Sequence, residues 1–83
     1  MITIQDFQYA SFERKCDVVT SHSDYLVTRA WKDGKVYLYW VDTFFIEVYY
    51  SPADKKVVMI NAFNDTASLE LYAEMVSLAD LNL

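Results

Sequence analysis

Glu47 is the residue of this sequence whose type and setting most suggest chemistry. It lies in the segment 36–50, whose residues are almost all aromatic or β-branched, which is typical of β-strands. The aromatic residues expected near it are Tyr37, Tyr39, Phe45 and Tyr49. A carboxylate among aromatic rings is costly unless it is paired or hydrated. Glu47 could therefore anchor a cationic ligand, with cation–π attraction from the tyrosines. Alternatively, it is solvated on an open face or paired with a lysine of a neighbouring subunit.

The single cysteine and the single histidine, Cys16 and His22, are the other candidates for chemistry. A Cys-x5-His pair could begin a zinc site, but zinc needs three or four ligands and the sequence has no second Cys or His. Nothing marks a third group that would orient the pair for nucleophilic catalysis. We therefore expect no metal, no cofactor and no catalytic residue, and we favour a protein that is not an enzyme.

Composition and charge narrow the classes of partner. The 83 residues predict one domain, 1–83, and the net charge of −5 disfavours nucleic acid and an anionic membrane surface. No apolar run approaches the ~18 residues of a membrane helix. A lone cysteine cannot form an internal disulfide, which favours a cytoplasmic location. The acidic charge also permits a basic partner, such as a toxin or nuclease that this chain would inhibit.

The positions of polar caps, turns and apolar runs predict an α+β fold. Thr3 and Asp6 favour a helix over about Ile4–Val18, and Asn64, Asp65 and Thr66 offer caps for a closing helix over about Thr66–Ala79. The closing helix has an apolar stripe that includes Leu69, Tyr72, Met75, Val76 and Ala79. Four strands are expected between the helices, at 25–31, 35–41, 44–50 and 56–63. Short connections make them a four-stranded antiparallel meander with an N-terminal and a C-terminal helix, α-β-β-β-β-α.

The hairpin turns decide which residues share a face of this sheet. A two-residue turn at Asp33-Gly34 would place Trp31 opposite Val36. A five-residue loop before the fourth strand would place Val48 opposite Val58.

The second hairpin allows two registers. A two-residue turn at Asp42-Thr43 would place Leu38 beside Glu47, and a three-residue loop, 41–43, would place Leu38 beside Ile46. We prefer the three-residue loop because it pairs apolar residues with apolar residues.

Under the preferred registers the sheet has two apolar faces. The first face is a core face that the two helices should cover, with Arg29 as its misfit. The second face carries Leu26, Thr28, Ala30, Tyr37, Tyr39, Phe45, Glu47, Tyr49, Val57, Met59, Asn61 and Phe63. If both helices cover the first face, the second is an exposed apolar patch of the kind that marks an interface or a ligand site.

Three interpretations of these faces stay open. Each helix covers a different face of a closed monomer, or two copies pack through the second face or through continued sheet edges, or the second face holds a partner protein or small ligand. We expect a non-catalytic association module, a homodimer or a protein-docking domain, with a small-ligand pocket or minor enzyme centred on Glu47 as the alternative. The candidate interface or ligand residues are Tyr37, Tyr39, Phe45, Glu47, Tyr49 and Met59.

Overall fold

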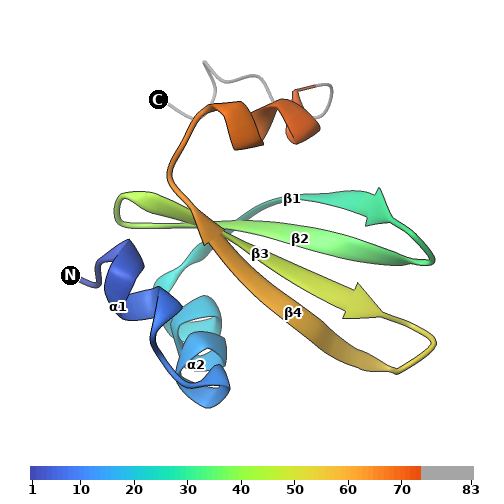
Figure 1. Cartoon of the computed structure of the whole chain (residues 1–83), viewed down its shortest axis with the longest axis horizontal. Helices are drawn as coiled ribbons and strands as arrows, with labels where there is room; N and C mark the ends of the chain where they lie inside the picture. The colour runs from blue at the N-terminus through green and yellow to red at the C-terminus, as the bar shows by residue number, and fades with distance from the viewer. Residues whose placement is uncertain (74–83) are drawn as a thin grey trace.

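A computed structural model describes residues 1–73 and shows a four-stranded antiparallel sheet with helical segments before and after it (Figure 1). The elements in chain order are α1 (Ile4–Gln8), α2 (Phe12–His22), β1 (Asp24–Trp31), β2 (Gly34–Val41), β3 (Phe44–Ser51), β4 (Lys56–Phe63) and the 3-10 helix η1 (Ala67–Tyr72). The strand order is β1-β2-β3-β4, which confirms the predicted meander and the α+β fold class.

The N-terminal helical segment is two helices instead of the predicted single helix. Thr3 caps α1, because its Oγ1 accepts from the amide of Asp6 at 3.1 Å. Ser11 caps α2 in the same way, accepting from the amide of Arg14 at 3.1 Å. A second N-cap side chain inside the expected helix favours a new helix start over continuation. The chain therefore turns between α1 and α2, and α2 continues to His22.

The first hairpin turns one residue earlier than predicted, at Lys32-Asp33. Trp31 pairs with Gly34 and Arg29 pairs with Val36, so the predicted Trp31–Val36 pairing is wrong. The reason is that Gly34 is the first residue of β2, where the backbone of β3 comes close to it, and is not a turn residue. A Cβ atom there would lie 2.0 Å from the backbone oxygen of Tyr50 on β3, so only glycine fits.

The second hairpin has the register that the sequence analysis did not prefer. Val41 pairs with Phe44 across a two-residue turn, and Leu38 pairs with Glu47. Asp42 makes this turn possible, since it has a φ of 49°, a left-handed conformation that aspartate tolerates better than most residues. The one-residue difference exchanges the two faces of β3 and β4 relative to those of β1 and β2.

The third hairpin is displaced by two residues, so Val48 pairs with Ile60 and not with Val58. Tyr49 pairs with Met59 whereas Tyr50 pairs with Val57, which leaves Val58 as the extra residue of a β-bulge. From Met59 onward the displacement is an even number of residues, so these β4 side chains keep their expected faces relative to β3. Before the bulge it is one residue, so Val57 pairs with Tyr50 and lies on the face opposite to the expected one.

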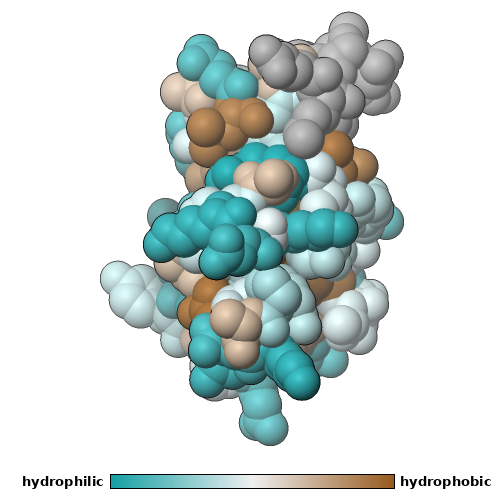
Figure 2. Space-filling model, turned by 90° about the vertical axis from the view of Figure 1, so that its right-hand side faces the viewer, coloured by the Kyte–Doolittle hydropathy of each residue, from teal (hydrophilic) through white to brown (hydrophobic). Residues whose placement is uncertain are grey.

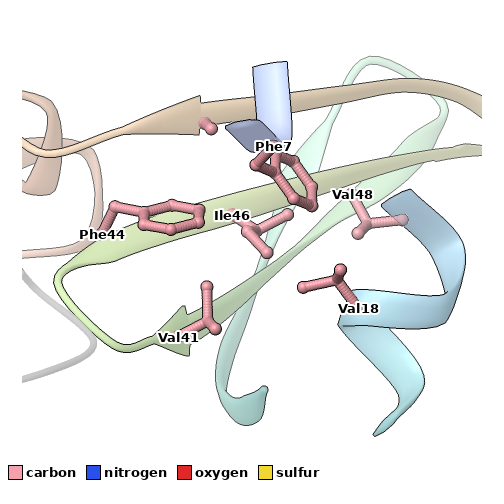
Figure 3. Close-up of a cluster of buried hydrophobic side chains, with 7 residues drawn as sticks. Phe7, Val18, Val41, Phe44, Ile46 and Val48 are labelled. Carbon is pink, nitrogen blue, oxygen red and sulfur yellow. The ribbon is translucent and has the colours of Figure 1, made fainter. Parts of the chain in front are cut away.

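Helical segments cover both faces of the sheet (Figure 1). Phe7 of α1 and Val18 of α2 pack on Phe44, Ile46 and Val48, which define the α face (Figure 3). On the opposite side, the η1 face, Leu69 and Tyr72 of η1 pack with Leu38, Phe45 and Phe63. Each face therefore has a hydrophobic cluster made with the chain's own helical segments. Met75, Val76 and Ala79 of the predicted closing helix lie outside the described residues.

Candidate functional site

The candidate site is a buried polar cluster around Glu47 in the middle of the η1 face. Glu47 is 4% exposed, and each carboxylate oxygen accepts hydrogen bonds. Oε2 accepts from the Tyr72 hydroxyl at 2.6 Å and from the Arg29 guanidinium at 3.4 Å. Oε1 accepts from the Asn61 amide at 3.0 Å and from the Tyr49 hydroxyl at 3.2 Å. We call these five residues the Glu47 cluster.

Three strands and η1 position the Glu47 cluster. Asn61 of β4 is the direct cross-strand partner of Glu47, and Tyr49 lies two residues along β3 on the same face. Arg29 comes from β1, and Tyr72 comes from η1. The Arg29 guanidinium also lies 5.3 Å from the centroid of the Tyr72 ring, which is cation–π distance. The cluster thus ties together segments that are far apart in the sequence.

Burial and the charges within the cluster shift its pKa values. Burial raises the pKa of Tyr72 strongly, and its hydrogen bond to Glu47 raises it further. Burial also raises the pKa of Tyr49, with a further increase from the charge of Glu47. Burial works against the charge on Arg29, but Tyr72 and Glu47 outweigh it, so the pKa of the guanidinium is raised overall. Both phenols therefore stay protonated donors and Arg29 stays a cation at neutral pH.

Both carboxylate oxygens of Glu47 are occupied by hydrogen-bond donors of the cluster. A buried carboxylate is tolerated where a cation and hydrogen-bond donors surround it, and both conditions hold here. Among the buried side-chain atoms that the structure describes, Nε of Arg29 has no hydrogen-bond partner. With 4% of Glu47 exposed, little of its surface is available to an external ligand. Within residues 1–73, no group of three His, Cys, Asp or Glu side chains is placed to hold a metal ion.

The six residues proposed from the sequence do not form one surface. Phe45, Glu47 and Tyr49 lie on the η1 face and are each less than 10% exposed. Met59 lies on the same face at the edge strand and is 45% exposed. Tyr37 and Tyr39 lie on the α face, half-buried against the other hydrophobic cluster. The separation follows from the register of the second hairpin.

Sequence reasoning missed Arg29, Asn61 and Tyr72 as partners of Glu47. Arg29 stood out as a charged residue among core positions, and Glu47 stood out in the same way. The signal that could have joined them is that two buried opposite charges need the same face, which selects the two-residue turn.

The free-energy contributions that favour docking of η1 on the sheet are similar in size to the entropy cost of ordering it. Leu69 and Tyr72 are 1% and 2% exposed, and burying two such side chains contributes about 3–6 kcal/mol. The hydrogen bond from Tyr72 to a charged group adds about 1.5–3 kcal/mol. Ordering the six residues of η1 costs about 6–12 kcal/mol of backbone entropy. The two ranges overlap, so we expect η1 to dock with a net free energy of no more than about 3 kcal/mol.

Apart from the Glu47 cluster, a concave region lies near the N-terminus. A cavity of 610 Å³ is lined by Met1, Ile2, Asp6, Ala10, Arg14, Val18, His22 and Asp42. Its charges are mixed and partly engaged, because Arg14 pairs with Asp17 at 2.6 Å and Asp42 accepts from the amide of Ile2 at 3.1 Å. His22 lines this cavity, whereas Cys16 of α2 is half-buried and is not one of its lining residues.

Two findings complete the description of the chain. None of the helices in residues 1–73 has the length and apolar character needed to cross a membrane. No protein-family model, no curated protein and no solved structure matches the sequence or the fold.

Proposed function

We propose that this protein is a non-catalytic association module that forms a homodimer through the outer edge of β4. The observation that carries the proposal is the pair of exposed apolar side chains on this edge strand, Val58 at 42% and Met59 at 45%. We place the contact at the edge and not at the aromatic face, because the chain's own helical segments pack on both faces of the sheet.

The surfaces other than the β4 edge favour association less. Phe45 and Tyr49 are buried beneath or beside η1, so the η1 face offers little aromatic area to a partner. Figure 2 shows the end of the molecule where the β1–β2 and β3–β4 turns lie, and its surface is mainly hydrophilic with small, separate hydrophobic patches. An interface of useful size is therefore expected along a side of the sheet.

The β4 edge has the backbone groups that strand pairing needs. Among the described residues, no strand pairs with the outer side of β4, and such an edge is a template for another chain. Met59–Phe63 follows the bulge at Val58 and is a regular run of five residues. Two copies related by a two-fold axis would pair these runs antiparallel and form an eight-stranded sheet.

The other edge, β1, is less suited to pairing. It begins with Asp24, and Arg29 in its regular part is committed to Glu47. Its exposed aromatic residue, Tyr25, is already engaged: its hydroxyl lies 2.7 Å from Oγ1 of Thr28, and its ring lies 5.8 Å from that of Tyr39. β4 has no comparable charge beyond its first residue.

Charge complementarity favours a second copy as the occupant of the β4 edge. Lys55 and Lys56 lie at the start of β4, and Asp65 lies two residues after its end. Antiparallel pairing would bring the lysines of one copy near Asp65 of the other. Hydrogen bonds from Ser68 lower the pKa of Asp65 and keep it anionic. Exposed pairs of this kind contribute little affinity but help to set orientation.

α1 would enlarge the interface beyond a single pair of strands. Stable dimers bury about 1,200–2,000 Å² in total, which is more than strand pairing alone provides. α1 packs against β4, and Tyr9 at its end is 89% exposed. An exposed tyrosine is the kind of residue that interfaces use.

Sedimentation velocity tests the proposal on the full chain. We expect a dimer at about 50 µM and at least a tenfold weaker association for Met59→Lys, which places a charge in the interface. Leu71→Lys is the matched control, because Leu71 is a 63% exposed apolar residue that belongs to η1 and not to the β4 edge strand. A wild-type chain that is monomeric at about 50 µM would contradict the proposal. So would a Met59→Lys variant that associates as well as Leu71→Lys.

A further inference from the structure

We propose that η1 is a detachable strap and that it occupies a tyrosine-accepting pocket on the η1 face, which the same segment of a second copy can also fill. This inference does not rest on pairing at the β4 edge, because it concerns the side chains that hold Leu69 and Tyr72 of η1. The Glu47 cluster would then bind the tyrosine of a second copy whenever the chain's own Tyr72 is displaced.

The pocket recognises a leucine and a tyrosine three residues apart. The Tyr72 hydroxyl donates to Oε2 of Glu47 at 2.6 Å, and the Arg29 guanidinium lies 5.3 Å from the centroid of its ring. Leu69 joins the cluster of apolar side chains that includes Phe45 and Phe63. A phenol is specified twice, by a hydrogen-bond acceptor at its end and a cation over its face.

η1 can leave the sheet without breaking a β-ladder. Its backbone hydrogen bonds are local, from the amide of Leu69 to Thr66 and from that of Ala73 to Glu70. Near its start, the Asp65 carboxylate accepts a hydrogen bond from the amide of Ser68 at 2.9 Å. In residues 1–73, no backbone hydrogen bond joins η1 to a strand. The attachment therefore consists of side-chain contacts, chiefly those of Leu69 and Tyr72.

A second copy is the occupant that the structure favours. Its η1 carries the side chains that already fit the pocket, so exchange replaces each contact with an identical one. Residues 64–66 connect β4 to η1 and span at most about 10 Å, which gives the chain's own strap a high effective concentration at the pocket. Exchange is thus expected only at high protein concentration or when the resident strap is weakened.

The test uses the full-length Tyr72→Ala variant, in which the pocket lacks its phenol, and a synthetic peptide with the sequence of residues 64–73. The readout is the NMR signal of the Asn61 side-chain amide, which donates to Glu47. We expect the peptide to shift this signal in Tyr72→Ala and to bind the wild-type chain at least tenfold more weakly. A peptide with phenylalanine in place of Tyr72 should bind about tenfold more weakly, because it lacks the hydroxyl that bonds to a charged group. A peptide with lysine in place of Leu71, which is 63% exposed, should bind like the parent.

Two results would overturn the inference: no peptide binding to a folded Tyr72→Ala chain, or equal binding of the tyrosine and phenylalanine peptides. If Tyr72→Ala does not fold, hydrogen exchange on the wild-type chain decides. The amides of Leu69 and Ala73 should then exchange at least 100-fold faster than those of β3, through local opening. Equal protection would show that η1 opens only with the whole domain. Introducing Met59→Lys should leave peptide binding unchanged, so failure of the strap and failure of the β4 edge are distinguishable.

Discussion

Replacing Tyr72 by phenylalanine tests how much the polar bond to Glu47 holds η1 on the sheet. The substitution removes one hydroxyl, which donates to Oε2 of Glu47 at 2.6 Å, and keeps the ring that packs beneath Arg29. A hydrogen bond to a charged group contributes about 1.5–3 kcal/mol, so we expect the free energy of unfolding to fall by about 2 kcal/mol. For a domain of this size, that loss lowers Tm by about 8–16 °C.

Urea unfolding followed by tryptophan fluorescence measures this loss. Both tryptophans report on the η1 face, since the Trp40 ring lies 4.6 Å from that of Phe45 and the Trp31 ring lies 4.9 Å from that of Tyr49. Dilute protein keeps self-association from adding to the measured stability. Tyr9→Phe is the matched control, because Tyr9 is 89% exposed and its hydroxyl should contribute less than about 0.5 kcal/mol.

A Tyr72→Phe variant within about 0.5 kcal/mol of the wild type would refute the reasoning. It would mean that apolar contacts alone hold η1 and that Glu47 gains nothing from the phenol. A double-mutant cycle with Glu47→Gln separates the two contributions, and we expect a coupling energy of about 1–3 kcal/mol. A coupling energy near zero would show that the 2.6 Å hydrogen bond between Tyr72 and Glu47 does not stabilise the fold.

Three further predictions concern the same sheet. Glu47→Ala leaves the Arg29 charge without its partner and should cost about 3–5 kcal/mol in urea unfolding, whereas a loss below about 1 kcal/mol would contradict a buried ion pair. Gly34→Ala forces a Cβ against the oxygen of Tyr50 and should cost about 1–3 kcal/mol; unchanged thermal stability would mean that β2 and β3 lie further apart there. Stability should fall as pH rises above about 10, because the pKa values of two buried phenols are raised and the folded chain keeps protons that the unfolded chain loses. The groups concerned are Tyr49 and Tyr72. A free energy of unfolding that stays constant from about pH 9 to about pH 12, which is from one unit below to two units above the ordinary tyrosine pKa, would refute their burial.

The strands could be predicted from the sequence because local chemistry determines them. The aromatic and β-branched runs coincide with β2, β3 and β4 to within one residue at each end. The N-terminal helices were harder, since the break depends on Ser11, a cap that competes with helix continuation. The Asp33-Gly34 signal failed because Gly34 serves the close approach of Tyr50, a contact between distant residues that no local pattern reveals.

The burial of the aromatic face could not be predicted, because it depends on which face each helical segment covers. The number of apolar residues on the two sheet faces indicated more apolar surface than two helices on one face could cover. In the structure, α1 and α2 cover the α face and η1 covers the other, so most of that surface is internal. Met59 is the one residue of the six candidates that stays substantially exposed, and it lies at the edge.

The register of the second hairpin shows why pairing apolar with apolar residues was the wrong criterion. Had Leu38 paired with Ile46, Glu47 would lie on the α face, across the sheet from Arg29, and would be a buried charge without a cation. In the observed register Leu38 opposes Glu47, and the carboxylate reaches Arg29 and Tyr72 on one face. An unpaired buried charge costs far more than a mismatched apolar pair gains. The two residues that least resemble core residues are therefore the ones that select the arrangement of the core, and the same pairing creates the acceptor to which η1 is fastened.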